Sequence, residues 1–111
     1  MNIKERFKRR YKREDKNYIT IQELMEMINK LDNVTLLDVR SVQEYEEGHL
    51  PGSMNFPLYE IERHAEKIVP DLNSIVIVYC QSGNRSEEAI RILKKKGYVN
   101  LYSLAHGLDG I

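Results

Sequence analysis

One short segment of the sequence combines the residue types that nucleophilic sulfur chemistry requires. It follows an apolar run, residues 75–79, and precedes a stretch with helical spacing. A tight turn there can point successive backbone N–H groups inward, and the next helix adds its unpaired N–H groups and the positive end of its dipole. In that setting we expect Cys80 to be a thiolate nucleophile. The expected substrate-binding residues are the five that follow it: Gln81, Ser82, Gly83, Asn84 and Arg85.

Both reactive residues of this segment also have a plainer interpretation. A lone cysteine at the end of an apolar strand is usually a small buried core residue. Arg85 can equally be a surface arginine that pairs with an acidic neighbour such as Glu88. The intervening residues favour the reactive interpretation of Cys80, because Gly83 and Asn84 tolerate unusual backbone angles that a core cysteine does not need behind it.

The rest of the chain alternates between strand and helix patterns. Two capping boxes, Thr20 to Glu23 and Ser41 to Glu44, predict helix starts. The first helix runs to about Leu31, and the second ends at Gly48. Further helices are expected at 58–69, with Ile61, Ala65 and Ile68 inward, and at 86–96; strands are expected at 18–19, 34–39, 54–56, 75–79 and 101–104. This alternation predicts an α/β fold, a mainly parallel sheet flanked by helices on both faces, in which ligands bind beyond the carboxyl ends of the strands.

The charge is distributed unevenly along the 111 residues, whose formal net charge is zero. Residues 1–16 hold eight Lys or Arg and three Asp or Glu, whereas residues 17–111 hold nine and fourteen. The chain therefore reads as a basic N-terminal arm, 1–16, and one acidic domain, 17–111. Ile3, Phe7 and Tyr11 recur at a spacing of four in the arm. The arm either docks on its own domain through them or binds an acidic protein partner; no nucleic acid is expected.

Several classes of protein are excluded by what the composition lacks. The longest wholly apolar run, 75–80, is too short to span a membrane, and no apolar secretory segment follows the N-terminus. One cysteine cannot form an internal disulfide, so we expect a free thiol and a cytoplasmic location. No two His or Cys residues have metal-ligand spacing, which predicts no metal and no cofactor. His49 is interpreted as a structural hydrogen bonder rather than a base.

Three segments together resemble the rhodanese-like superfamily over residues 18–107. They are Leu36-Leu37-Asp38-Val39-Arg40, Glu47-Gly48-His49-Leu50-Pro51-Gly52-Ser53-Met54-Asn55, and Tyr79-Cys80-Gln81-Ser82-Gly83-Asn84-Arg85-Ser86. The resemblance implies a five-stranded parallel sheet, with Cys80 as nucleophile and the loop from Gln81 to Arg85 around the transferred sulfur. It also implies a sulfurtransferase that moves a sulfane sulfur from thiosulfate or a persulfide to a thiol or cyanide acceptor through a Cys80 persulfide.

Loop length separates this interpretation from its rivals. Four residues lie between Cys80 and Arg85, whereas the related dual-specificity phosphatases and arsenate-reducing enzymes place one more residue there. The smaller ring suits a single sulfur atom better than a tetrahedral oxyanion. The alternatives that stay open are a non-catalytic rhodanese-like binding module and a cysteine-dependent phosphatase or arsenate reductase.

Two further regions bear on the site. Asp38 and Arg40 end another predicted strand, so they either flank the pocket or Arg40 forms an ion pair with Glu44 or Glu47. The family usually follows its last strand with Gly-Gly-Trp and a closing helix, whereas residues 104–111 contain no Trp and the sequence stops. We expect the edge that this helix would cover to be left to the basic arm or to another chain.

Overall fold

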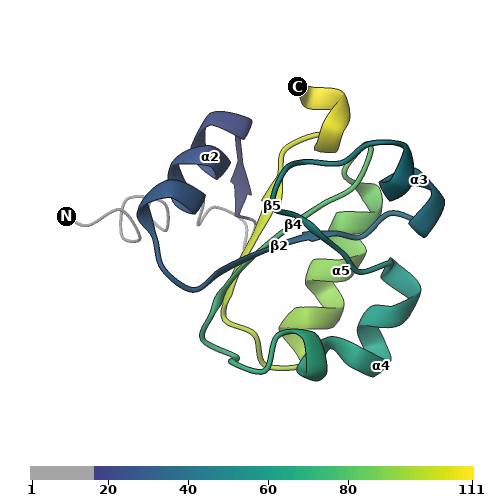
Figure 1. The fold of residues 1–111 in the computed structure, drawn as a ribbon. Helices are drawn as coiled ribbons and strands as arrows, with labels where there is room; N and C mark the ends of the chain where they lie inside the picture. Colours follow the sequence, from purple (N-terminus) through teal and green to yellow (C-terminus); the bar gives the residue numbers. More distant parts are fainter. Residues whose placement is uncertain (1–16) are drawn as a thin grey trace.

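A parallel β-sheet forms the centre of the computed structural model, which describes residues 17–111 (Figure 1). Its five strands are arranged in the order β1-β5-β4-β2-β3, and every neighbouring pair is parallel. The strands are β1 (Tyr18–Ile19), β2 (Val34–Asp38), β3 (Met54–Asn55), β4 (Ile75–Tyr79) and β5 (Asn100–Leu104). The predicted α/β fold with a five-stranded parallel sheet is confirmed. The predicted basic arm, residues 1–16, lies outside the described residues.

Helices cover both faces of this sheet, as the alternating pattern predicts. They are α2 (Ile21–Lys30), α3 (Val42–Glu47), α4 (Leu58–Ile68), α5 (Asn84–Lys95) and the 3-10 helix η2 (Gly107–Gly110). Helix α2 lies on one face, and α4 and α5 lie on the other (Figure 1). Both predicted capping boxes form, because Glu23 and Glu44 each return a hydrogen bond to their N-cap residues. Within residues 17–111, the helices are too short or too polar to cross a membrane.

Strand β4 is buried along its whole length and separates two apolar cores. Successive side chains of a strand point to opposite faces. Val76 and Val78 therefore pack with α4 and α5, whereas Ile77 and Tyr79 pack with α2. Cys80 continues this alternation directly after the strand, and its side chain joins the α4–α5 core. The central strand thus delivers Cys80 to the face where α5 begins.

Two expectations about the helices were wrong. Helix α5 begins at Asn84, two residues before the predicted start, because Gly83 completes the turn in a left-handed backbone conformation (φ +107°) and the helix follows at once. Ile68 is 38% exposed instead of pointing inward, since it is the last residue of α4. The other predicted boundaries differ from the structure by one residue at most, which is within the ordinary fraying of element ends.

Candidate active site

The sulfur of Cys80 accepts hydrogen bonds from two backbone N–H groups at the start of α5. The N–H of Gly83 points to Sγ at 3.0 Å, and that of Ser86 does so at 3.4 Å. The thiol lies 3.6 Å from the Ser86 hydroxyl oxygen, while that hydroxyl donates to the carbonyl of Gly83 at 2.9 Å. Cys80 itself has no exposed surface. The first turn of α5 therefore closes around the sulfur, and donors at a helix N-terminus favour negative charge on it.

The backbone conformation of Gly83 makes its hydrogen bond to the sulfur possible. Its positive φ turns its N–H back towards the sulfur, in a backbone conformation that residues with a Cβ rarely adopt. The N-cap residue Gly83 has no side chain to cap α5, and the Cys80 sulfur instead accepts from the N–H of Ser86 in the first turn of the helix. Sequence reasoning placed Gly83 in the loop for this reason but missed Ser86, which it treated only as the start of a helix.

Arg85 does not pair with Glu88, as one interpretation expected, but with Glu44 across the gap between α5 and α3. Its two terminal nitrogens donate to the two carboxylate oxygens at 2.6 and 3.0 Å. This hydrogen bonding lowers the pKa of Glu44 from 4.5 to about 2 and is the main cause that raises the pKa of Arg85. Glu88 pairs with Arg91 instead. The charge of Arg85 is therefore already balanced by the carboxylate of Glu44.

Glu44 was missed as a site residue because its place in a capping box already explained it. It accepts from the N–H of Ser41 at 3.1 Å, as the capping box predicts, and binds Arg85 with the same carboxylate. A helix cap is a local feature, whereas the pairing joins residues 41 positions apart. No spacing in the sequence indicates such a contact.

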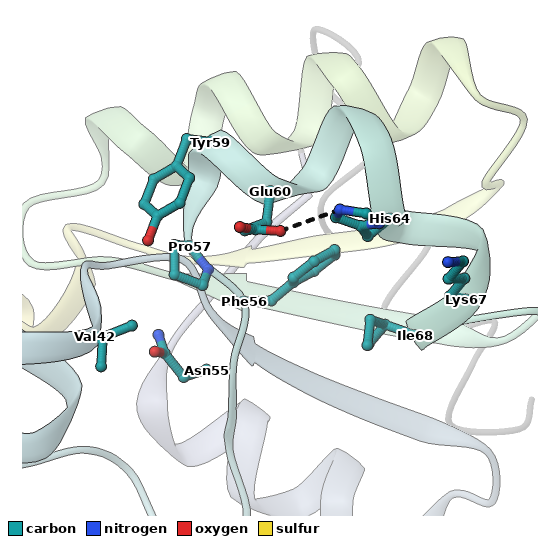
Figure 2. Close-up of a pocket in the computed structure, with 9 residues that line it drawn as sticks. All are labelled: Val42, Asn55, Phe56, Pro57, Tyr59, Glu60, His64, Lys67 and Ile68. Atoms are coloured by element: carbon teal, nitrogen blue, oxygen red, sulfur yellow. Dashed lines mark ion pairs between the residues drawn. The ribbon is translucent and has the colours of Figure 1, made fainter.

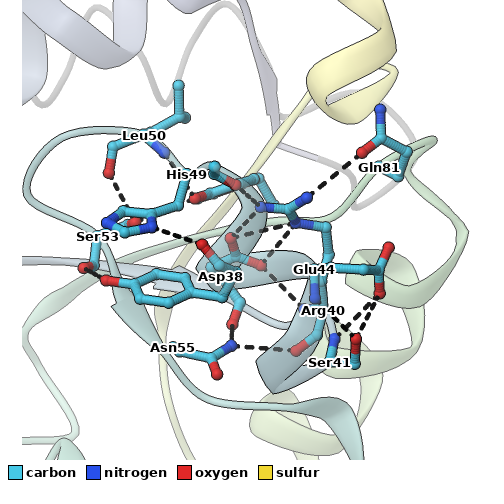
Figure 3. A network of polar contacts seen from close by, with 12 residues as sticks. Asp38, Arg40, Ser41, Glu44, His49, Leu50, Ser53, Asn55 and Gln81 are labelled. Carbon is cyan, nitrogen blue, oxygen red and sulfur yellow. Dashed lines mark hydrogen bonds and ion pairs between the residues drawn. The ribbon is translucent and has the colours of Figure 1, made fainter.

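Arg40 forms a buried ion pair with Asp38, not with Glu44 or Glu47 as one of the two interpretations expected (Figure 3). The side chains are 5% and 0% exposed, and their closest atoms lie 2.8 Å apart. A carboxylate buried at the end of β2 requires a charged partner nearby, and Arg40 is two residues away. The hydrogen bond to Asp38 is the largest cause that raises the pKa of Arg40.

Gln81 connects this ion pair to the cysteine loop. Its amide oxygen accepts from Arg40 at 3.4 Å, and its amide nitrogen donates to Asp109 at 2.8 Å. The side chains of Ser82 and Asn84 are exposed. Of the five residues predicted to bind substrate, the structure thus gives Gln81, Gly83 and Arg85 contacts around the site, and leaves Ser82 and Asn84 facing outward.

The chain after β5 returns to the base of the cysteine loop. The N–H groups of Leu108 and Asp109 donate to the carbonyls of Cys80 and Gln81 at 3.0 and 2.9 Å. A Cβ on Gly107 would lie 2.4 Å from the Cys80 carbonyl oxygen, so only glycine allows this approach. The 3-10 helix η2 therefore packs against the cysteine loop. It lies in the segment after β5, where the sequence predicts that the closing helix of the family is missing.

The turn before β3 is fastened to the central strand by Tyr79. Its hydroxyl donates to the Ser53 hydroxyl and accepts from the N–H of Leu50, both at 3.0 Å. Burial is the main cause that raises the pKa of Tyr79 to about 12. His49 stacks on Tyr45 at 3.6 Å, and its Nδ1 lies 2.7 Å from the Tyr45 carbonyl oxygen. This contact agrees with the structural role expected for His49.

A separate surface pocket of about 400 Å³ lies along α4 (Figure 2). None of residues 80–86 lines it. Its walls are Val42, Asn55, Phe56, Pro57, Tyr59, Glu60, His64, Lys67 and Ile68. In the described part of the chain, no cluster of three or more His, Cys, Asp or Glu side chains could hold a metal ion.

Comparison with known proteins places this geometry in a family. The model of the Rhodanese-like domain matches residues 20–111. Thiosulfate sulfurtransferase PspE of Escherichia coli (strain K12) is 39% identical over 75 residues, which are 68% of this chain and 71% of that protein. A Bacillus subtilis (strain 168) relative is 32% identical over 90 residues, 81% of this chain. The chain spans about half the length of that relative, 48%.

A solved structure shows the same arrangement. The protein described as rhodanese with anions from E. coli superposes with a TM-score of 0.64 at 37% identity. The superposition covers 70% of this chain and 91% of the E. coli chain. With the family model matching 92 of 111 residues, from 20 to 111, the fold and the sequence agree. The chain belongs to the rhodanese-like domain family.

Proposed function

We propose that this chain is a sulfurtransferase that carries a sulfane sulfur as a persulfide on Cys80. The observation that carries the proposal is the pair of backbone donors to Sγ, the N–H groups of Gly83 at 3.0 Å and Ser86 at 3.4 Å. Fixed donors of this kind stabilise an anionic sulfur without reorganising during the reaction. The thiosulfate sulfurtransferase name of the E. coli relative supports the same activity.

The first step loads the enzyme. The Cys80 thiolate attacks the outer sulfur of thiosulfate, a new S–S bond forms, and the donor's S–S bond breaks. Sulfite leaves with the electron pair of that bond, so Cys80 becomes a persulfide anion. Cys80 is fully buried, so this step requires the loop to move far enough to admit the donor.

The second step passes the sulfur on. Cyanide or a thiolate attacks the outer sulfur of the persulfide, forms thiocyanate or a new persulfide, and returns the electron pair to Cys80 as thiolate. The sequence has a single cysteine, so no internal thiol can resolve the intermediate. The acceptor therefore comes from outside the chain.

Intact-mass measurement after incubation with thiosulfate tests the proposal. We expect wild-type protein to gain about 32 Da, one sulfur atom, and to lose it on addition of cyanide as thiocyanate appears. Cys80→Ser should gain nothing, since an alcohol at this position stays protonated near neutral pH and carries no persulfide. Circular dichroism checks that the variant is folded.

The same protein sample separates the rival functions. A wild-type mass that stays unchanged with thiosulfate, with thiosulfonates and with persulfides would contradict sulfur transfer. Turnover of a phosphate ester without persulfide formation would favour the phosphatase alternative. Neither reaction, in a folded protein, would favour a non-catalytic binding module.

A further inference from the structure

The charges in contact with the cysteine loop balance to a slightly negative sum. Arg40 and Arg85 contribute two positive charges, and both are held by carboxylates. With Asp109 on the Gln81 amide, three carboxylates face two guanidinium groups, leaving −1 with histidines neutral and before the charge of the Cys80 thiolate is added. A loop that receives anionic donors thus has its cations engaged before any donor arrives.

The two arginines differ in how firmly they are held. Arg40 is 5% exposed and forms part of the buried scaffold. Arg85 is 38% exposed and lies in the sequence between Gly83 and Ser86, whose N–H groups contact the sulfur. Its pKa is raised first by Glu44 and also by the charge of Cys80. Arg85 is therefore the cation that a donor at the sulfur would meet, and it is already occupied by Glu44.

We propose that Glu44 determines donor specificity by holding Arg85, so that the site favours singly charged sulfur donors over the thiosulfate dianion. The proposal rests on the sulfur transfer proposed above and adds the class of donor: persulfides and thiosulfonates of charge −1. A guanidinium paired with a carboxylate offers a second anion little net attraction, and the loss grows with the charge of that anion. Glu44 is a positioning residue, because it acts through Arg85.

Two donors with matched chemistry isolate the effect of charge. Methanethiosulfonate carries −1 and thiosulfate carries −2, and each delivers the same terminal sulfur. In both reactions the Cys80 thiolate forms an S–S bond with that sulfur while the donor's S–S bond breaks. Methanesulfinate leaves in the first reaction and sulfite in the second, each with the bonding electron pair, so no oxidant or reductant is needed.

The test is Glu44→Gln, with kcat/KM measured for both donors and cyanide as acceptor. The substituted side chain keeps an amide oxygen for the N–H of Ser41, so the helix cap survives. Freeing Arg85 should raise the thiosulfate-to-methanethiosulfonate ratio of kcat/KM by about 1.4-fold to fivefold, the range expected for one partly exposed charge contact. The increase should shrink as salt is added.

Glu88→Gln is the matched control. It removes a carboxylate from the exposed Glu88–Arg91 pair on the same helix as Arg85, α5, and changes the net charge of the protein by the same amount. We expect the donor ratio to stay at the wild-type value. A ratio that rises equally in both variants would overturn the proposal, because it would reflect overall charge rather than release of Arg85.

A second variant tests the proposal without leaving the Arg85 charge unpaired. In Glu44→Gln combined with Arg85→Gln, two amides replace the ion pair and the local charge is unchanged. The proposal expects this double variant to have the wild-type donor ratio. If Arg85 already attracts thiosulfate in the wild-type protein, its loss will lower the ratio, and that result would overturn the proposal. An unchanged ratio in folded Glu44→Gln would also overturn it while leaving persulfide formation intact. Wild-type protein that loads from neither donor would instead contradict the proposed function.

Discussion

At the scale of single residues, the sulfur receives its hydrogen bonds from backbone N–H groups more than from side chains. Gly83 and Ser86 contribute N–H groups, which any residue with the same backbone angles supplies. Ser82 and Asn84 face outward. The other residues of the loop therefore matter through the turn they permit. For this reason Gly83, beside the reactive Cys80, could be singled out from sequence.

The pairing of Glu44 with Arg85 predicts an acid-sensitive stability. The pKa of Glu44 falls from 4.5 to about 2 in the folded protein. A depressed pKa stabilises the fold above the unfolded value, and this stabilisation is lost as pH falls through the folded value. We therefore expect wild-type melting temperature to decline between about pH 4.5 and 2 more steeply than that of Glu44→Gln, which cannot titrate there.

Thermal melts recorded by circular dichroism at half-unit pH intervals measure this difference. Glu88→Gln serves again as the comparison, because Glu88 lies in an exposed pair in which salt and water screen the charges. Parallel wild-type and Glu44→Gln curves through this window would show that the ion pair contributes nothing measurable to folding.

At the scale of elements, local signals predicted most element boundaries to within one residue, whereas long-range contacts were missed. The two capping boxes located the starts of α2 and α3, because each is complete within four residues. The packing of η2 on the cysteine loop depends on residues 28 positions apart, Leu108 and Cys80, and no local pattern contains it. The one available signal was Gly107, a glycine directly after a strand and its turn.

Gly107→Ala should therefore destabilise the protein strongly. A Cβ there would lie 2.4 Å from the Cys80 carbonyl oxygen, and φ is +59°. Overpacking against backbone together with a left-handed alanine should lower the free energy of unfolding by about 2–5 kcal/mol. Urea denaturation measures this, and the shifted loop should also slow persulfide loading.

Gly52→Ala is the control for backbone angle alone. Gly52 also has a positive φ, +82°, but nothing lies within 4 Å of its Cβ position. The substitution should cost only the conformational share, about 1–2 kcal/mol, and leave loading unchanged. Equal destabilisation by the two variants would mean that η2 yields easily and does not hold the loop.

At the scale of the whole molecule, the strand order explains why the site assembles where it does. β4 lies between β5 and β2, so the cysteine loop contacts the chain after β5 on one side, through Cys80 and Leu108, and Arg40 just after β2 on the other, through Gln81. Alternating strands and helices indicated a parallel sheet and hence a site at the carboxyl ends. Which carboxylate pairs with which arginine there depends on distances between strands and helices that periodicity does not encode.

The basic arm provides the last prediction, which concerns charge over the full chain. Deleting residues 1–16 removes a charge of +5 and leaves −5. The residues proposed for the site lie outside it, so thiosulfate:cyanide activity at physiological salt, about 0.15 M, should be nearly unchanged. If the arm binds acidic partners, the full chain should bind polyglutamate with an affinity that falls steeply as salt rises, and the deletion should abolish binding.

Activity and melting temperature of the deleted protein separate the two interpretations of the arm. Lost polyglutamate binding with an unchanged melting temperature supports an electrostatic arm. A lower melting temperature with no polyglutamate binding in the full chain supports docking through Ile3, Phe7 and Tyr11, whose burial would contribute roughly 1.5–3 kcal/mol each. A fall in thiosulfate activity at physiological salt, with the melting temperature unchanged, would contradict the prediction. It would mean that the arm takes part in the reaction, whereas the proposed site consists of residues 80–86 and their contacts.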